Sequence, residues 1–354
     1  VHEPANFVPM LSALGAKEKK VRLDLKTASE AVRNILTKSG AKVVDGGDLC
    51  FLPKAIKSAS EINGSLAAHV RDGAALTSFL SWLSRTTKHS TVTEMSAASM
   101  LYEFRRKDPK FRGLSFETIS GSGPNGAIVH YRVTPETDRS LSAGDIYLVD
   151  SGAQYLDGTT DVTRTVYIEQ TNGFPAPLTV QEHFTRVLKG HIAIAEARFP
   201  HGTSGPQIDA LARIALWEVG LDYDHGTGHG VGSYLSVHEG PQRISKKGGT
   251  VPMEPGMIIS NEPGYYKEGV YGIRIENLVV VTVSSELAGD KKDRILSFET
   301  LTLAPIDKNL IIPQLLNENE KNWLNQYHQR VRDTLSNIVD EDARDWLIEA
   351  TTRI

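Results

Sequence analysis

Residues 149–165, VDSGAQYLDGTTDVTRT, place two carboxylates, Asp150 and Asp161, on either side of a turn at Asp157 and Gly158. The glycine-containing turn and the β-branched residues after it favour a hairpin of two antiparallel strands. Such a hairpin brings side chains from adjacent strands to one point. The stretch therefore predicts a pair of acidic side chains at one end of a sheet.

A second stretch, residues 261–277, repeats this arrangement later in the chain. It reads NEPGYYKEGVYGIRIEN and holds Glu262 and Glu276 on either side of a glycine-rich connection. Four carboxylates in one cleft would repel each other and raise each other's pKa values unless cations neutralised them. Divalent metal ions are the simplest neutralisers.

Between these stretches, residues 225–241 read HGTGHGVGSYLSVHEGP and supply His225, His229 and His238 among several glycines. Glycines let the backbone approach a ligand closely, and clustered imidazoles in such a loop contribute little to a core. One histidine is enough as a metal ligand, which leaves two for substrate and oxyanion contacts. His130, in IVHYR, is expected on a strand, where an ordinary hydrogen-bonded histidine would explain it equally well.

These candidates form a ligand set of hard oxygen atoms with one imidazole and no sulfur. That mixture suits Mn²⁺, Co²⁺, Fe²⁺ or Zn²⁺ more than a structural zinc site. Four carboxylates suit two ions, roughly 3.5 to 4 Å apart, with a shared water that becomes hydroxide at neutral pH. The set predicts metal-dependent hydrolysis. Taken singly, each aspartate could instead be a turn cap.

Length and composition limit the class of protein. The 354 residues, 40% of them hydrophobic, suggest about two globular domains, and a net charge of −4 argues against a nucleic-acid partner. Cys50 is the only cysteine, which excludes an intramolecular disulfide and a thiolate zinc cage and fits a reducing compartment. No apolar run approaches the roughly 18 to 20 residues of a membrane span, and the first residues resemble no signal peptide. We expect a soluble, cytoplasmic protein without a membrane partner.

The order of the expected elements suggests two related halves, each with two helices followed by strands. One expected helix begins at Ser60. The other expected helices are residues 25–38, 93–106, 181–199, 206–219, 318–339 and 343–350. The expected strands are residues 127–133, 145–150, 161–169, 257–262 and 272–282. Identity between the halves is too weak to prove a repeat.

Read in order, DSGAQYLDGTTDVTRT, HGTGHGVGSYLSVHEGP, NEPGYY and GIRIEN resemble aminopeptidase P, the Xaa-Pro aminopeptidase family of the pita-bread metallopeptidases. The resemblance covers roughly residues 55–354 and is closest to the long, cytosolic-type members. It implies an α+β pita-bread (creatinase/aminopeptidase) fold with pseudo-symmetric halves. We expect residues 1–54 to be the remnant of a middle creatinase-like domain, 55–300 the catalytic domain, and 301–354 a C-terminal helical extension.

The resemblance also implies the metal ligands. Asp150 would bind one metal ion, His229 and Glu262 would bind the other, and Asp161 and Glu276 would bridge the two. No ligand of the family pattern is substituted. The ions would be Mn²⁺ first, with Zn²⁺ or Co²⁺ as alternatives.

Four residues near these ligands, and the ligand Glu262, receive further roles from the same resemblance. His130, His225 and His238 would be catalytic histidines that bind substrate, and His238 would stabilise the tetrahedral intermediate. Glu262 would double as the proton shuttle, and Arg274 would be a partner of the metal-binding carboxylates.

The implied reaction removes the N-terminal residue from a peptide whose second residue is proline. Hydroxide bound to the two metal ions would attack the carbonyl before that proline, and Glu262 would pass the proton to the departing imino nitrogen. We expect the C-terminal extension to contribute to a homodimer interface, as the resemblance also implies, because it carries four apolar side chains: Trp323, Tyr327, Trp346 and Leu347. Composition does not separate this role from packing against the chain's own core, since large aromatic residues are enriched in both places.

Alternatives of two classes stay open. Prolidase, which cleaves only dipeptides, and methionine aminopeptidase share the fold, and an assay of a tripeptide against a dipeptide separates prolidase from aminopeptidase P. A non-catalytic peptide-binding module is the alternative from another class, because relatives of this fold that lost the ligands have that character. The intact ligand set favours the enzyme.

Overall fold

The computed structural model describes residues 1–170, 173–284 and 295–354, and the chain divides into two compact units, Val1–Lys54 and Ala55–Ile354. The first unit pairs two parallel strands, β1 (Lys20–Leu23) and β2 (Lys42–Asp45), across a connecting helix. Its helices are α1 (Phe7–Gly15) and α2 (Glu30–Lys38), and a short helix, α3 (Phe51–Ala55), follows at the boundary in sequence.

Helix α2 begins at Glu30 and not at residue 25, where the sequence pattern predicted its start. Ser29 is the reason, because its side chain accepts a hydrogen bond of 3.2 Å from the backbone N–H of Ala31. A serine in this position satisfies a backbone donor that the helix itself leaves free. The cap therefore sets the first residue of the helix.

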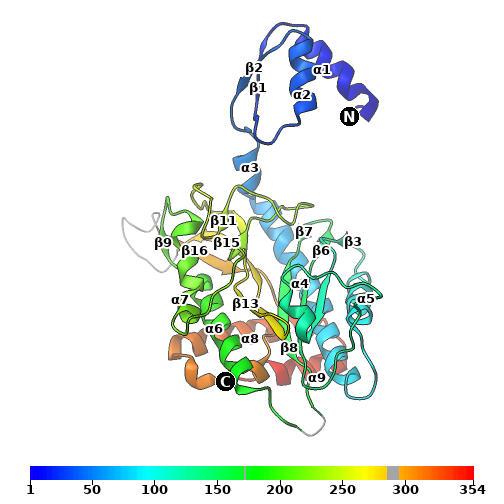
Figure 1. Cartoon of the computed structure of the whole chain (residues 1–354), viewed down its shortest axis with the longest axis vertical. Helices are drawn as coiled ribbons and strands as arrows, with labels where there is room; N and C mark the ends of the chain where they lie inside the picture. The colour runs from blue at the N-terminus through cyan, green and yellow to red at the C-terminus, as the bar shows by residue number, and fades with distance from the viewer. Residues whose placement is uncertain (171–172, 285–294) are drawn as a thin grey trace. The chain divides into compact units, whose positions relative to one another are not determined.

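The second unit consists of two halves, each with helices that precede antiparallel strands (Figure 1). The first half contains α4 (Ala59–Thr86), α5 (Glu94–Arg105), β3 (Phe111–Leu114), β4 (Ile119–Ser122), the 3-10 helix η2 (Gly123–Ala127), β5 (Ile146–Ser151), β6 (Ala153–Tyr155), β7 (Gly158–Thr159) and β8 (Val162–Tyr167). The second half contains α6 (Leu178–Ala195), β9 (Phe199–Pro200), η3 (Gly205–Gln207), η4 (Asp209–Ala212), α7 (Ile214–Trp217), β10 (Gly228–His229), β11 (Arg243–Ile244), β12 (Ile258–Asn261), β13 (Gly264–Lys267), β14 (Tyr271–Arg274), β15 (Asn277–Val283) and β16 (Ile295–Thr300).

Each half encloses a short hairpin within a longer one. Strand β5 pairs with β8, and between them β6 pairs with β7. In the same way β12 pairs with β15, and between them β13 pairs with β14. The four acidic residues lie where the outer strands stop. Asp150 is next to the end of β5, Asp161 directly precedes β8, Glu262 directly follows β12, and Glu276 directly precedes β15.

Besides the start of α2, three predicted elements differ from the structure. Residues 127–133 form no strand, because η2, with Pro124 in its first turn, is followed by a loop, so the expected strand position of His130 is wrong. Residues 206–219 form η3, η4 and the short α7 instead of one helix. Residues 272–282 are two strands, since the chain leaves β14 before Glu276 and joins another sheet as β15.

The C-terminal segment packs into the core of the second unit. It holds η6 (Lys308–Leu310), η7 (Pro313–Leu315), α8 (Glu318–Leu335) and α9 (Glu341–Ala350), and Figure 1 shows α8 and α9 close together. Tyr327 and Leu347 are buried in one apolar cluster with side chains of α6, and Trp323 and Trp346 pack against that cluster. These four side chains therefore contact the chain's own core.

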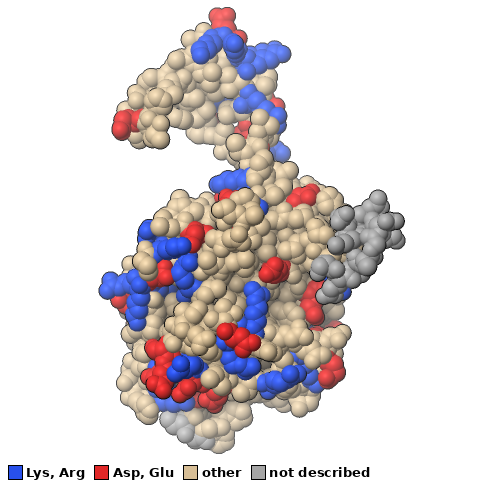
Figure 2. All heavy atoms as spheres, turned by 180° about the vertical axis from the view of Figure 1, so that it is seen from behind, with Lys and Arg blue, Asp and Glu red and all other residues tan. Residues whose placement is uncertain are grey.

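Charged side chains of both signs are mixed on the molecular face in Figure 2, where the described residues form no continuous basic band. A phosphate backbone is usually bound by such a band. Among the described helices, none is long and apolar enough to cross a membrane.

Candidate metal centre

All nine residues singled out by the sequence line one cavity of about 530 Å³ in the second unit. Both halves contribute to it. The first half supplies the histidine after η2 and two carboxylates, and the second half supplies the remainder: His130, Asp150, Asp161, His225, His229, His238, Glu262, Arg274 and Glu276. The fold thus brings residues that are up to 146 positions apart in the chain, such as His130 and Glu276, into one cavity.

Asp161, His229 and Glu276 converge in this cavity, and one ligand atom from each lies within 4.8 Å of the other two. His229 Nε2 lies 3.5 Å from Asp161 Oδ2 and 3.5 Å from Glu262 Oε1. Its Nδ1 lies 3.0 Å from the carbonyl oxygen of Gly230 and donates to it, because a carbonyl can only accept. The ring therefore turns its Nε2 toward the carboxylates.

Asp150 has one oxygen atom held by protein and one that is not. Arg274 donates to its Oδ2 over 2.7 Å, whereas Oδ1 is buried with no hydrogen-bond partner among the described residues. Arg274 Nε also donates to the Thr163 hydroxyl over 3.2 Å, and that hydroxyl donates to Glu276 Oε2 over 2.8 Å. Arg274 thus orients two carboxylates, one directly and one through Thr163.

The carboxylates of the cavity carry perturbed acidities. Burial raises the pKa values of Asp161 and Glu276 well above the usual range, and the neighbouring carboxylates raise them further. Burial also raises the pKa of Glu262. Although burial opposes the charge of Arg274, the Tyr266 hydroxyl and the carboxylates hold its pKa well above its usual value. The one guanidinium that contacts these carboxylates, that of Arg274, does not balance their charge, so the oxygen-rich donor set and the orphaned Asp150 oxygen fit divalent cations.

His225 is fixed by its neighbours. Its Nδ1 donates to the carbonyl oxygen of Gly226 over 2.8 Å, and its Nε2 lies 2.8 Å from the Tyr266 hydroxyl, from which it accepts. The same hydroxyl accepts from Arg274 NH1 over 2.5 Å. Burial lowers the pKa of His225 to about 3 and raises that of Tyr266 to about 12. Both side chains are therefore neutral near pH 7 and form a chain of hydrogen bonds to Arg274.

The two other histidines lie toward solvent. The His238 ring meets the His229 ring edge to face, with centroids 4.1 Å apart. Partial burial, followed by the neighbouring His229, lowers the pKa of His238 to about 4, so its ring is neutral near pH 7 and keeps an N–H to donate. His130 is exposed on the cavity wall.

Residues 225–241, which we call the histidine loop, are held along the edge of β12. The N–H of Glu262 donates to the carbonyl of Thr227 over 2.8 Å, and the N–H of Val231 donates to that of Ile258 over 3.1 Å. A side chain at Gly228 would overlap the carbonyl oxygen of Ser260. Glycine at this position therefore lets the loop approach β12 closely enough for His229 to reach the carboxylates.

Sequence reasoning missed Tyr266 and Ser260. Ser260 donates to Glu262 Oε1 over 3.1 Å and accepts from the N–H of His229 over 2.9 Å, so it aligns two candidate ligands. Tyr266 lies inside the glycine-rich stretch of residues 261–277, which is the one signal that could have found it. Arg132 and Arg243 also line the cavity, and no sequence pattern indicated them.

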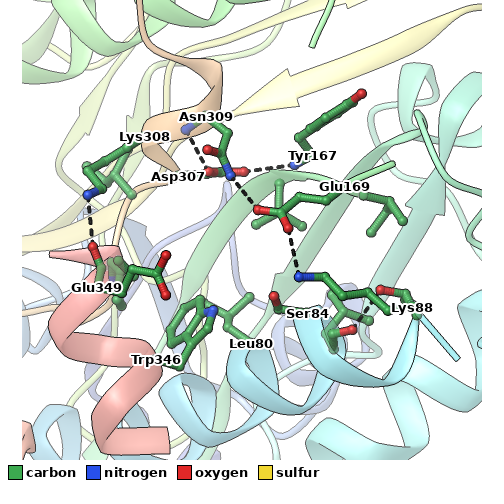
Figure 3. Close-up of a pocket in the computed structure, with 17 residues that line it drawn as sticks. Leu80, Ser84, Lys88, Tyr167, Glu169, Asp307, Lys308, Asn309, Trp346 and Glu349 are labelled. Carbon is green, nitrogen blue, oxygen red and sulfur yellow. Dashed lines mark hydrogen bonds and ion pairs between the residues drawn. The ribbon is translucent and has the colours of Figure 1, made fainter. Parts of the chain in front are cut away.

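A second cavity, of about 210 Å³, lies where α4, the end of β8 and the C-terminal segment meet (Figure 3). Asp307 Oδ2 accepts from the N–H of Tyr167 over 2.8 Å. Glu169 accepts from Lys88 over 2.9 Å and from Asn309 over 3.1 Å. These polar groups pair across the cavity, and they tie the C-terminal segment to the first half.

Known proteins resemble this chain over most of its length. The chain is 49% identical over 302 residues to the probable Xaa-Pro aminopeptidase P of Laccaria bicolor, a match that covers 83% of this chain and 46% of that protein. The chain spans about half the length of the curated relatives it matches.

Two solved structures share its fold. One is an X-prolyl aminopeptidase from Caenorhabditis elegans, described as a cytosolic enzyme with a di-nuclear active site, with 38% identity, a TM-score of 0.89, and coverage of 100% of this chain and 58% of that one. The other is an Xaa-Pro dipeptidase from Bacillus anthracis, with 25% identity, a TM-score of 0.69, and coverage of 84% and 78%. These likenesses confirm the predicted α+β pita-bread fold with two related halves.

Family models agree with the structural comparison. The model of metallopeptidase family M24 matches residues 65–283, which is more than half of the chain. The model of the C-terminal region of the same family matches residues 294–354. This is a family of metal-dependent peptidases, and the oxygen-rich cavity of the chain fits the metal ions that such peptidases need. The chain therefore belongs to metallopeptidase family M24.

Proposed function

We propose that this chain contains the catalytic site of an Xaa-Pro aminopeptidase, which releases the N-terminal residue from peptides with proline in the second position. The proposal rests above all on Asp161, His229 and Glu276, whose ligand atoms converge within 4.8 Å in one cavity. The names of the similar proteins from Laccaria bicolor and Caenorhabditis elegans support the substrate class. The presence of all five candidate ligands supports an enzyme over a binding module.

The cavity would hold two divalent ions. We assign Asp150 to one ion, His229 and Glu262 to the other, and Asp161 and Glu276 as bridges. Bound ions would supply an activated water and a positive charge that polarises the scissile carbonyl. We propose Mn²⁺, with Zn²⁺ or Co²⁺ as alternatives, because carboxylate oxygens dominate the set and one imidazole completes it.

The chain's own residues would move the protons and orient the peptide. Glu262, whose pKa burial raises, takes a proton from the attacking water and delivers it to the imino nitrogen of proline. Neutral His238 donates its N–H to the developing oxyanion. His130 and His225 line the same cavity and would bind the substrate. Proline lacks an N–H, so its ring must be recognised by shape.

A direct test compares three substrates with Mn²⁺-loaded protein. An Xaa-Pro-Xaa tripeptide should be hydrolysed, whereas the matching Xaa-Ala-Xaa tripeptide should not. A prolidase would instead prefer the Xaa-Pro dipeptide, which is the activity named for the Bacillus anthracis neighbour. Turnover of the dipeptide alone would replace the present proposal with that one, and no turnover of any substrate by protein that binds Mn²⁺ would refute both.

We further propose a cytoplasmic homodimer in which residues 1–54 belong to a creatinase-like domain, 55–300 form the catalytic domain, and 301–354 form the extension. The description of the Caenorhabditis elegans enzyme as cytosolic supports the location. Ile338 and Ile348 remain exposed on the extension, at 53% and 45%, and offer apolar contacts to a partner. Replacing both with lysine should convert a dimer into a folded monomer in light scattering. An unchanged mass would place the interface elsewhere.

A further inference from the structure

Arg164 lies fully buried behind the candidate metal centre, with 1% of its surface exposed. One terminal nitrogen, NH1, donates to the carbonyl oxygens of Thr163 over 2.8 Å and of Glu276 over 2.7 Å. Its Nε donates to the carbonyl of Pro305 over 2.9 Å. The guanidinium therefore fixes the main chain of β8 to the main chain at Glu276, where two halves of the fold meet.

The other terminal nitrogen of Arg164 reaches the C-terminal extension. NH2 lies 2.8 Å from Asn277 Oδ1, 2.9 Å from the carbonyl of Ala304, and 2.9 Å from the Tyr327 hydroxyl. Tyr327 is on α8 and is 5% exposed. Its hydroxyl also accepts from the N–H of Ala304 over 3.2 Å. One hydroxyl group thus joins α8 to the arginine that holds Glu276.

We propose that Tyr327 is a positioning residue for the metal centre, acting on Glu276 through Arg164. The inference rests on the proposed function in one respect, the assignment of Glu276 as a bridging ligand. A guanidinium has its donors in a rigid fork, so a group that fixes NH2 also fixes the direction of NH1. Without the hydroxyl, Arg164 loses one buried acceptor and the main chain at Glu276 loses a restraint. The C-terminal region then belongs to the metal centre and is more than a packing element.

The Tyr327 ring has a separate packing role that the test must leave intact. The ring stacks on Trp323, with centroids 5.3 Å apart and planes 5° apart. Tyr327→Phe keeps this ring and removes only the hydroxyl. His328→Gln is the matched control, because His328 is the next residue of α8 and accepts from the N–H of Ile306 over 3.1 Å. It holds the same helix to the same segment without a hydrogen bond to Arg164.

The test measures Mn²⁺ binding by calorimetry and, separately, the unfolding midpoint without metal. We expect Tyr327→Phe to bind Mn²⁺ about tenfold more weakly than the parent, the lower end of the usual effect of groups that support ligands. His328→Gln should lower the unfolding midpoint but keep the parent's affinity. Parental affinity in Tyr327→Phe, or an equal loss in both variants, would overturn the proposal. A parent chain that binds no Mn²⁺ would instead overturn the proposed function and the ligand assignment with it.

A second measurement needs no variant, so it decides the matter even if Tyr327→Phe does not fold. Coupling between two sites is reciprocal, and Mn²⁺ must therefore strengthen the Tyr327 contact as much as that contact strengthens binding. The N–H of Ala304, which donates to Tyr327, should exchange with deuterium about tenfold more slowly when Mn²⁺ is added. The N–H of Thr351, bonded to Leu347 at the end of α9, is the control. Equal slowing at both amides, or no slowing at Ala304, would contradict the coupling.

Discussion

Arg274 donates a hydrogen bond of 2.7 Å to Oδ2 of Asp150, while Oδ1 of the same carboxylate is buried and has no partner among the described residues. Buried polar atoms are almost always paired, so an orphaned carboxylate oxygen beside other carboxylates indicates a place for a cation. The arginine fixes the direction in which that oxygen points. The contact with Arg274 therefore both orients the carboxylate and leaves its other oxygen available to a metal ion.

Arg274→Lys should weaken both metal binding and catalysis. The guanidinium contacts Asp150, Thr163 and Tyr266 at once, and a lysine ammonium cannot reproduce this planar arrangement. We expect Mn²⁺ affinity and kcat/KM to fall on the order of 10- to 100-fold. Calorimetry and steady-state kinetics on the same preparation measure the two effects. Parental values of both would show that the positive charge alone is sufficient.

Metal binding should release protons and strengthen as pH rises. Burial raises the pKa values of Asp161 and Glu276, so these groups retain protons in the metal-free protein at a pH where free carboxyls have lost them. Binding requires the deprotonated ligands and displaces these protons. Calorimetry of Mn²⁺ binding in two buffers with different ionisation enthalpies should give different heats. Identical heats would mean that the carboxylates are already ionised in the metal-free state.

The sequence predicted the acidic pairs and the histidine loop because both depend on local turns and on chemistry that side chains carry with them. Asp161 stands at the start of the predicted strand and directly precedes β8 in the structure, whereas Glu276, predicted inside one strand, lies between β14 and β15. The contacts of Tyr327 could not be predicted, because Arg164 and Tyr327 are 163 positions apart and meet only through tertiary packing. A buried arginine surrounded by carbonyl oxygens has no pattern in the sequence.

Tertiary packing also explains why some elements were predicted wrongly. Residues 206–219 have helical periodicity, but the buried Arg213 donates to the carbonyl oxygens of Tyr223 and His225 over 2.6 and 3.0 Å. These bonds anchor the start of the histidine loop and favour a tight, irregular course over one regular helix. Tertiary contacts here override local propensity. The departure from the predicted helix therefore lies beside the candidate metal centre.

Loss of a bridging carboxylate should be more damaging than loss of a histidine on the cavity wall. Asp161→Asn and Glu276→Gln each remove a ligand assigned to both ions, whereas His130→Ala removes an exposed side chain that contributes only to substrate contacts. We expect the two bridge variants to lose essentially all turnover and His130→Ala to retain part of it. Metal analysis accompanies the kinetics. Two retained ions with near-normal turnover in either bridge variant would make the two-metal assignment wrong.

His328, on helix α8, should make folding stability sensitive to acid. Burial lowers the pKa of His328 from 6.5 to about 3, so folding favours the neutral ring. Its contribution to stability is complete above pH 6.5 and is lost as the pH falls toward 3, because the unfolded chain then binds the additional proton. The slope in this window is about 1.4 kcal/mol per pH unit for one such histidine. Urea unfolding at pH 7, 6 and 5 should show a steeper loss for the parent than for His328→Gln. Equal slopes would assign the acid sensitivity to other groups.

Two neighbouring glycines provide the sharpest test of how the histidine loop reaches the carboxylates. A Cβ at Gly228 would overlap the backbone carbonyl of Ser260, which cannot move without displacing β12. A Cβ at Gly226 would meet its nearest neighbour, the carbonyl of Ile244, at 3.4 Å, which is close to ordinary contact. Gly228→Ala should therefore displace His229 and reduce Mn²⁺ affinity at least tenfold, while Gly226→Ala should keep the parent's affinity and fold. Similar affinities in both variants would show that the close approach of the loop to β12 is not what places His229.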